Sequence, residues 1–285
     1  MITDLNQRWR DRRGTYRPAG EVIRTSDYDV APALHKPIKD FVLRHHYSSR
    51  YPAARRRFGL YRRGELVGAA VFSHPCRNDV LTGVLPGSHT DSMELGRLVL
   101  LDDVQANGES WFVARCFDLL RREGVVGIVS FSDPVERRRT DGSVIFPGHV
   151  GCLYQALNAV YLGRGKPRIL RIFPDGVVLS DRTISKIRSQ EKGWLGGVRL
   201  LEQYGAEPLA GIQARKQDWS PREIVAPTVI AADPREWLKV WVPRITTPLR
   251  HTGNHKYVFA LDRHAKKGLP ASLPYPKKMF EVRSA

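Results

Sequence analysis

The chain has 285 residues, and its 42% hydrophobic and 26% charged content is typical of a globular protein rather than a disordered one. Its 46 lysines and arginines exceed 29 aspartates and glutamates, and the resulting charge of +17 favours a polyanionic partner such as nucleic acid over a merely solvated basic surface. The sequence contains no apolar run of the length of a membrane span, no apolar signal core and no C-x-x-C zinc pair, and its three separated cysteines are typical of a reducing cytoplasm.

The first part of the chain predicts an arm, a helix and a hairpin. Residues 1–30 are polar and basic, and we expect an arm that becomes ordered against a partner. Apolar residues at helical spacing between Pro32 and His46 predict a helix that runs into the polar, aromatic segment H-H-Y-S-S-R-Y-P. Two strand-like runs that meet at Arg63-Gly64-Glu65 predict a β-hairpin.

The centre of the chain alternates strands and helices. The expected elements are a strand over Met93–Leu100, a helix over Trp111–Arg122, a strand over Val125–Phe131 that ends in Ser-Asp-Pro, and a helix over Gly148–Tyr161. This order predicts an α/β fold on a mixed sheet.

The loop Asp102–Ser110 lies between the first of these strands and its helix. Such a loop places free backbone N–H groups at a helix N-terminus, where anions bind. Asn107, Gly108 and Ser110 are therefore candidates for binding the phosphates of a cofactor. The acidic residues of the same loop would repel a phosphate and are equally consistent with helix N-terminal charges that answer the helix dipole.

The last part of the chain predicts a second hairpin that turns at Pro174-Asp175-Gly176 and a basic helix over Asp181–Lys192. From about Ala210 prolines interrupt the pattern, and one strand is expected over Lys256–Leu261 before a Lys- and Pro-rich end. We expect three segments: a basic N-terminal arm (1–30), a catalytic domain (31–205) and a C-terminal extension (206–285) that packs on the core or on DNA.

Four motifs carry a resemblance to a known family. They are H-H-Y-S (His45–Ser48), L-G-R-L-V-L (Leu95–Leu100), S-F-S-D-P (Ser130–Pro134) and the Gly-rich, aromatic segment Gly148–Gly165. On these motifs the chain resembles the Mom family of phage DNA-modification proteins, a divergent branch of the GCN5-related N-acetyltransferase (GNAT) superfamily. The resemblance implies a GNAT-like mixed twisted sheet flanked by helices.

The resemblance also implies a function. Members of the family add a methylcarbamoyl-type group to N6 of adenine in phage DNA and so block host restriction enzymes, which implies double-stranded DNA as the partner and the cytoplasm of the bacterial host as the location. The family is linked to bound iron. GNAT enzymes usually hold coenzyme A with a Q/R-x-x-G-x-G/A turn, but this chain has D-D-V-Q-A-N-G-E-S there, so acetyl-CoA and another acyl or one-carbon donor both stay open.

The candidate catalytic residues are His46, Tyr47, Arg97, Ser132, Asp133 and Tyr154. Asp133 follows an apolar strand, where the functional groups of open α/β sheets gather, and it is a candidate proton acceptor or, with His46, a metal ligand; a simple turn is the alternative. Tyr154 is interpreted as a general acid or as a core tyrosine. Arg97 would pair either with Asp133 or Glu94 or with a substrate phosphate.

Clusters of basic residues are the candidate DNA contacts. They are Arg55, Arg56, Arg57, Arg137, Arg138, Arg139, Lys266 and Lys267. Two other functions stay open at this point: an acyl-CoA-dependent N-acetyltransferase of a protein or small amine, and a non-catalytic DNA-binding protein.

Overall fold

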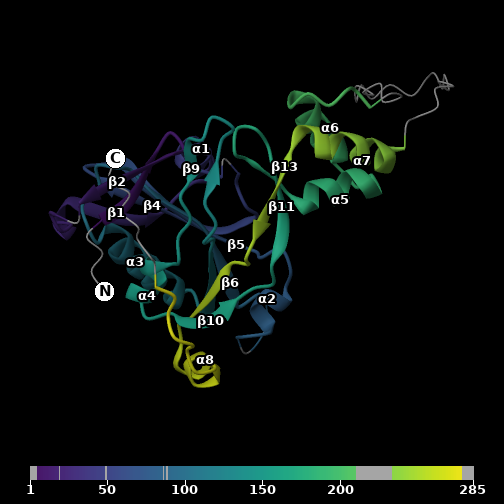
Figure 1. Ribbon diagram of the computed structural model, residues 1–285. Helices are drawn as coiled ribbons and strands as arrows, with labels where there is room; N and C mark the ends of the chain where they lie inside the picture. Colours follow the sequence, from purple (N-terminus) through teal and green to yellow (C-terminus); the bar gives the residue numbers. More distant parts are fainter. Residues whose placement is uncertain are drawn as a thin grey trace, which may run out of the picture. The chain divides into compact units, whose positions relative to one another are not determined.

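A computed structural model describes residues 5–18, 20–48, 50–85, 87, 89–209 and 233–277 (Figure 1). These residues form two compact units. Unit 1 takes its residues from Met1–Arg137, Val144–Pro167 and Thr252–Ala285, and unit 2 from Arg138–Ser143 and Arg168–His251. The chain thus leaves unit 1 and later returns to it, whereas the sequence suggested a division near residue 205. Within the described ranges, no helix combines the length and the apolar character that a membrane span requires.

Unit 1 is built on a seven-stranded sheet with the order β10-β14-β7-β6-β5-β4-β3. The strands are β3 (Tyr28–Pro32), β4 (Ala54–Arg62), β5 (Glu65–Ser73), β6 (Ser92–Leu100), β7 (Gly127–Ser132), β10 (Val160–Arg164) and β14 (His255–Ala260). Neighbouring strands are antiparallel except for β6 and β7, which are parallel. The predicted mixed α/β fold is therefore confirmed.

Helices cover both faces of this sheet. They are α1 (His35–His45), α2 (Asp79–Thr82), α3 (Gly108–Arg122), α4 (Cys152–Ala156) and α8 (Arg263–Gly268), with a 3-10 turn at Thr25–Asp27. Phe117 of α3 shares a core with Phe72 of β5, whereas Val42 of α1 shares another core with Val71 of the same strand. Because successive side chains of a strand point to opposite faces, α3 and α1 lie on opposite sides of the sheet.

The parallel pair β6–β7 is bonded over only part of its length. Its register runs from Ser92 beside Gly127 to Glu94 beside Val129 and then stops, although both strands continue. Gly96 is an extra residue opposite β5, and a Cβ added there would lie 2.4 Å from the Oγ of Ser73. Beyond Glu94 the two strands thus no longer pair with each other, and side chains from the flanking segments can meet between them.

The N-terminal segment expected as an arm is a folded hairpin over its described residues. β1 (Leu5–Arg10) and β2 (Arg13–Pro18) pair antiparallel, and β1 contacts both α1 and β6. Trp9 is 8% exposed and Arg8 is fully buried. The polar, basic composition of this segment did not indicate a hairpin, because its buried side chains contact residues that lie far away in the sequence.

The prediction of a single helix over Gly148–Tyr161 is wrong. α4 spans only Cys152–Ala156, and β10 begins soon after it. Gly148, Gly151 and Asn158 have φ of 73°, 79° and 57°, which are not helical values, so they bound the short helix on both sides. The apolar spacing that suggested one helix combines residues of a loop, a helix and a strand.

Over its described residues, unit 2 combines a small antiparallel sheet with three helices. Its elements are β11 (Arg168–Ile172), β12 (Val178–Leu179), β13 (Thr247–His251), α5 (Asp181–Ser189), α6 (Trp194–Gln203) and α7 (Pro234–Ile245). The hairpin at Pro174-Asp175-Gly176 is confirmed, and Ser180 caps α5 by accepting a hydrogen bond from the N–H of Thr183. α7 was not predicted, because its prolines suggested a break, but Pro234 occupies the first turn, where no N–H is needed.

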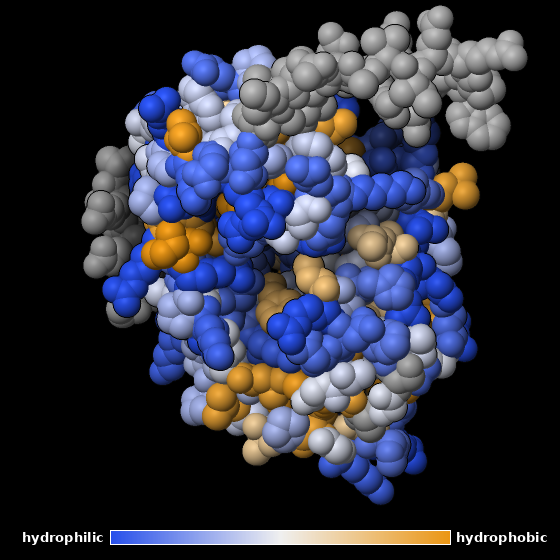
Figure 2. Space-filling model, turned by 90° about the vertical axis from the view of Figure 1, so that its right-hand side faces the viewer, coloured by the Kyte–Doolittle hydropathy of each residue, from blue (hydrophilic) through white to orange (hydrophobic). Residues whose placement is uncertain are grey.

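A further two-stranded ribbon is formed by β8 (Arg137–Arg138) and β9 (Val144–Phe146). The molecular face in Figure 2 is largely hydrophilic, and its hydrophobic side chains form small separate patches. This agrees with the high content of charged residues.

Candidate active site

Five of the six predicted catalytic residues meet in one cluster beside the point where β6 and β7 stop pairing. His46 and Tyr47 follow α1, Arg97 lies on β6, Asp133 follows β7 and Tyr154 lies on α4. The rings of His46 and Tyr47 are 4.3 Å apart, Arg97 acts electrostatically on both, and Tyr154 and Asp133 act on Tyr47. Four separate segments therefore bring their polar side chains to one place.

His46 is buried and neutral. Burial, reinforced by the positive charge of Arg97, holds its pKa well below the ordinary value. The backbone N–H of Ser48 donates to its Nδ1 at 3.1 Å, and since this group can only donate, the imidazole proton lies on Nε2. His46 thus offers the cluster an N–H donor rather than a free lone pair at Nε2.

Asp133 is held in place by Arg137. An Nη1–H of Arg137 donates to Oδ2 of Asp133 at 2.6 Å, and the N–H of Val135 donates to Oδ1 at 3.0 Å. The Arg137 guanidinium lies 4.3 Å from the centre of the Phe146 ring and 5.6 Å from that of Tyr47. Arg137 was a candidate DNA contact, but it is buried against these rings.

Glu94 belongs to the same cluster and was considered only as a partner for Arg97. Burial raises its pKa to about 7, and the positive charge of Arg97 opposes this rise. The Tyr154 phenol interacts with both Glu94 and Ser130, and burial raises its pKa to about 12. The Glu94 carboxyl group therefore ionises near neutral pH, whereas the neighbouring Tyr154 phenol stays protonated. The only sequence signal was one acid inside an apolar strand.

Arg97 is held by backbone carbonyls. Its Nε–H donates to the carbonyl of Arg50 at 3.0 Å and an Nη1–H donates to that of Gly96 at 2.5 Å. This anchoring fixes a positive charge beside Glu94 and His46.

A group of aromatic rings in contact with one another borders the cluster. The ring centroids of Tyr47 and Phe146 are 4.3 Å apart, those of Trp9 and Tyr47 are 5.1 Å apart, and that of His149 lies 6.0 Å from Phe146. Trp9 and Phe146 were missed by the sequence reasoning. Trp9 gave no signal, because the hairpin that carries it was expected to be an arm.

Ser132, the sixth predicted residue, is fully buried at the end of β7, and its Oγ has no hydrogen-bond partner among the described residues. Across the strands it faces His255, whose Nδ1 lies 2.6 Å from the Tyr161 hydroxyl. His255 lies at the start of β14 in the main sheet.

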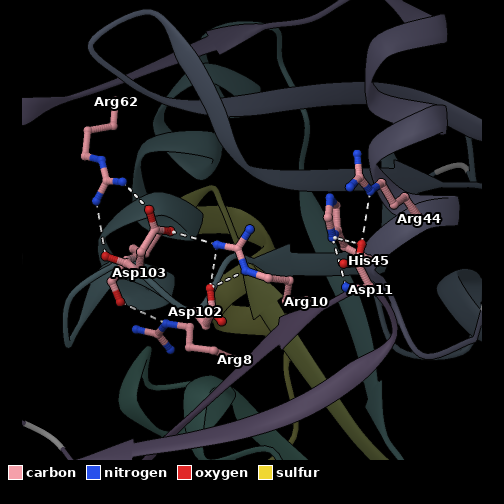
Figure 3. A network of polar contacts seen from close by, with 9 residues as sticks. Arg8, Arg10, Asp11, Arg44, His45, Arg62, Asp102 and Asp103 are labelled. Carbon is pink, nitrogen blue, oxygen red and sulfur yellow. Dashed lines mark hydrogen bonds and ion pairs between the residues drawn. The ribbon is translucent and has the colours of Figure 1, made fainter.

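The predicted phosphate-binding loop is held by arginines. The buried Arg8 donates to the carbonyls of Val104 at 3.1 Å and Gln105 at 2.7 Å and pairs with Glu109. Figure 3 shows Arg10 bonded to Asp102 and Arg62 bonded to Asp103. Each acidic side chain of the loop thus has a cationic partner.

The cofactor-binding candidates lie within this arrangement. Asn107 precedes α3 with a φ of 62°, the hydroxyl of Ser110 donates to its carbonyl at 3.0 Å, and Gly108 is buried. A pyrophosphate at this turn would meet three carboxylates and compete with them for Arg8, Arg10 and Arg62. The loop as it stands does not fit a coenzyme A pyrophosphate.

The predicted iron ligands, His46 and Asp133, also fit a metal poorly. The Nδ1 of His46 accepts from Ser48, and Asp133 is bonded to Arg137. Across the described part of the chain, no three His, Cys, Asp or Glu residues are grouped closely enough to hold a metal ion.

The other candidate DNA contacts fall into two groups. Arg55 donates to the carbonyl of Ser92 at 2.7 Å, Arg57 donates to that of Ala33 at 3.4 Å, and Arg56 pairs with Glu123. Arg138, Arg139, Lys266 and Lys267 are exposed. The first group supports the fold of unit 1, and the second is accessible to a partner.

Comparisons with solved structures give low scores. A GNAT family N-acetyltransferase (YhbS) from Escherichia coli in complex with CoA is 15% identical with a TM-score of 0.29, and the match covers 38% of this chain and 64% of that one. An N-acetyltransferase from Staphylococcus aureus Mu50 is 11% identical with a TM-score of 0.31, covering 50% of this chain and 87% of that one. A tandem GNAT protein from the clavulanic acid biosynthesis pathway is 11% identical with a TM-score of 0.34, covering 62% and 64%.

No curated protein matches the chain. A protein-family model does match, over residues 27–211, and its description is the Mom protein family. The match includes α1, β6, β7 and α4, which carry the clustered residues described above. Since it spans well over half of the 285 residues, the chain belongs to the Mom protein family.

Proposed function

We propose that this protein is a DNA-modifying transferase that adds a methylcarbamoyl-type group to N6 of adenine and so protects phage DNA from host restriction. Membership of the Mom family supports this proposal. The observation that carries it is the convergence of His46, Tyr47, Arg97, Asp133 and Tyr154, from four segments, on one largely buried cluster.

The chemistry needs a proton acceptor, because N6 of adenine must lose a proton when it forms a bond to the carbonyl carbon of the donor. Glu94 suits this role, since a carboxyl group with a pKa of about 7 is a competent base at neutral pH. Asp133 suits it less, because it is bonded to Arg137. As the N–C bond forms, the bond from that carbon to the leaving group breaks.

The other members of the cluster would stabilise the charges that develop. Arg97 and the Nε2–H of His46 are donors for the oxygen of the donor carbonyl as it becomes negative. Tyr154 keeps its proton at neutral pH and can give it to the leaving group. None of these roles requires iron or a coenzyme A pyrophosphate, neither of which the residues present fit.

The adenine has to leave the base stack to reach such a cluster, which costs a few kcal/mol of unstacking. Tyr47 is half-buried beside the polar residues, and stacking on an aromatic ring is how enzymes hold flipped bases. We therefore assign Tyr47 to base binding, Phe146 and Arg137 to the support of its ring, and Asp133 to the positioning of Arg137.

Mass spectrometry of nucleosides from plasmid DNA grown with this protein tests the proposal. We expect a modified deoxyadenosine with the wild-type protein and little or none with Tyr154→Phe, which removes only a hydroxyl group. Tyr204→Phe is the matched control, because the Tyr204 hydroxyl bonds Asp175 in unit 2. A digest with only ordinary deoxyadenosine, from cells that contain abundant soluble protein, contradicts the proposal.

A further inference from the structure

Unit 2 contains two helices joined by a short turn. α5 ends at Ser189 and α6 begins at Trp194, and the turn includes Gln190 and Gly193 with φ of 51° and 84°. Ile187 of α5 and Leu201 of α6 are buried in one core that also includes residues of α7. A four-residue turn that contains glycine is the connection found between the two helices of a helix-turn-helix, and here α7 packs in the same core as the pair.

Two adjacent glycines, Gly196 and Gly197, lie on different faces of α6. A Cβ at Gly197 would lie 3.0 Å from side-chain atoms of Ile187 and Thr183, so glycine allows α5 and α6 to approach closely. A Cβ at Gly196 would meet nothing within 4 Å. Gly197 therefore faces α5, and Gly196 faces outward.

The outward face of α6 carries side chains that suit DNA bases. Gly196, Arg199 and Gln203 are exposed and lie three and four residues apart, which places them on one side of the helix. Arginine pairs with the O6 and N7 atoms of guanine and glutamine with the N6 and N7 atoms of adenine in the major groove. Gly196 lies beside them next to open space, where an acidic side chain would repel the phosphates.

The helix pair also has the charge that DNA requires. Between Ser180 and Gly205 there are five lysines and arginines and three aspartates and glutamates, and Glu191 is already paired with Arg182. Arg188, Lys192 and Arg199 are exposed and have no carboxylate partner in the described part of the chain. These cations can contact phosphates.

We propose that α5 and α6 form a DNA-binding helix-turn-helix, in which α6 enters the major groove of a duplex and α5 contacts its backbone. The inference rests on the proposed function in one respect, since it assigns a second binding site for the same DNA substrate. It adds a means of reading the bases around the modified adenine that is separate from the catalytic cluster.

Binding of the full-length protein to a labelled duplex, measured by fluorescence anisotropy at physiological salt with competitor DNA present, tests this inference. We expect Arg199→Ala and Gly196→Glu to weaken binding roughly tenfold or more, the first with a smaller salt dependence. Gly196→Ala is the matched control, because it adds a methyl group to the same open space, and it should bind like the wild type. Arg122→Ala, which removes an exposed arginine of unit 1, should do the same.

The possible outcomes distinguish a failure of this inference from a failure of the proposed function. Equal affinities for Gly196→Glu and Gly196→Ala, or a preference of the wild type for an acidic protein or single-stranded RNA over duplex DNA, would overturn it. If DNA stays unmodified but Gly196→Glu still loses duplex binding, the proposed chemistry fails and the helix-turn-helix stands. If the wild type modifies DNA and Gly196→Glu binds and modifies it equally well, only the helix-turn-helix fails.

Discussion

Two polar regions of unit 1 contrast with each other: the loop Asp102–Ser110 and the cluster beside β6 and β7. In the loop, Asp102, Asp103 and Glu109 each face an arginine of β1 or β4. In the cluster, Asp133 is paired with Arg137, but Glu94 is buried with its pKa shifted to about 7. In the first region each carboxylate is paired with an arginine, whereas the second keeps one carboxyl group whose protonation changes near neutral pH.

The difference teaches that the number of polar residues does not identify a site. Both regions contain several polar residues in the sequence, and the loop was the one predicted to bind phosphates. What separates them is whether each buried or half-buried charge already has a partner within the fold. The following predictions test that distinction, beginning with the largest expected effect.

Glu94→Gln should lower the rate of adenine modification by a factor of about 10² to 10⁴, because an amide cannot accept the proton. The wild-type rate should rise as pH rises through about 7, where Glu94 ionises, and the variant should lose this dependence. Initial rates of modified nucleoside formation across this pH range provide the measurement. Glu65→Gln, on the exposed start of β5, is the matched control.

Glu94→Gln should lower the modification rate but raise the thermal stability of the protein above pH 7. Since the folded-state pKa of Glu94 is raised, the contribution of this carboxyl is fully present below its ordinary pKa and is lost as pH rises through about 7. Glu94→Gln should therefore unfold at a higher temperature than the wild type above pH 7 and gain nothing in acid. A variant that is less stable in alkaline solution would show that Glu94 is paired after all.

Arg8→Met should lower the free energy of unfolding by about 3–5 kcal/mol, because it leaves the carboxylate of Glu109 buried without a partner. Urea unfolding measures this loss. The double variant Arg8→Met/Glu109→Leu should recover most of it, since both charges are then removed. If the double variant is as unstable as the single one, ion pairing is not what holds the loop.

Asp133 and Arg137 should behave as one unit. A double-mutant cycle with Asp133→Ala and Arg137→Ala should give a coupling of about 1–3 kcal/mol in the free energy of unfolding. The two single variants should also lose modification activity to a similar degree, because each displaces the guanidinium from Phe146. Strictly additive effects would separate Asp133 from Arg137 and restore Asp133 as a candidate base.

The smallest effect is expected from Arg10→Ala. Arg10 and Asp102 are 44% and 33% exposed, and a pair of this kind contributes less than about 1 kcal/mol, a value that falls as salt increases. Urea unfolding at low and high salt measures the change. A loss as large as that of Arg8→Met would mean that the whole loop network, and not the buried Arg8, stabilises this region.

Local signals predicted much of the fold. The hairpin at Arg63-Gly64 was predicted because two strand-like runs meet there, and the structure gives both residues the positive φ of a tight turn. The start of α5 was predicted because Ser180 and Asp181 are both residue types that cap helices, and Ser180 is the cap. Contacts between distant segments were not predictable in this way. Trp9 packs against Tyr47 and Arg8 bonds to Val104 without any pattern near either residue that reveals it.

Motifs in the sequence identified the residues of the candidate site, but they did not reveal the burial, the hydrogen-bond partners or the pKa of these residues. The resemblance selected Asp133 and Tyr154, but only the folded structure pairs Asp133 with Arg137 and buries Glu94 near Tyr154. A pKa depends on burial and on neighbours that several segments supply, so no window of the sequence contains the information.

The position of β14 in the sheet has a consequence for synthesis of the protein. β14 lies between β7 and β10, yet it is translated only after all of unit 2. Until His255–Ala260 leave the ribosome, β7 keeps an open edge that can pair with other chains, and closing it requires contacts between residues far apart in the sequence, which form slowly. Release of a chain truncated before His255 should therefore yield aggregates, and slower translation through unit 2 should lengthen the exposure of that edge.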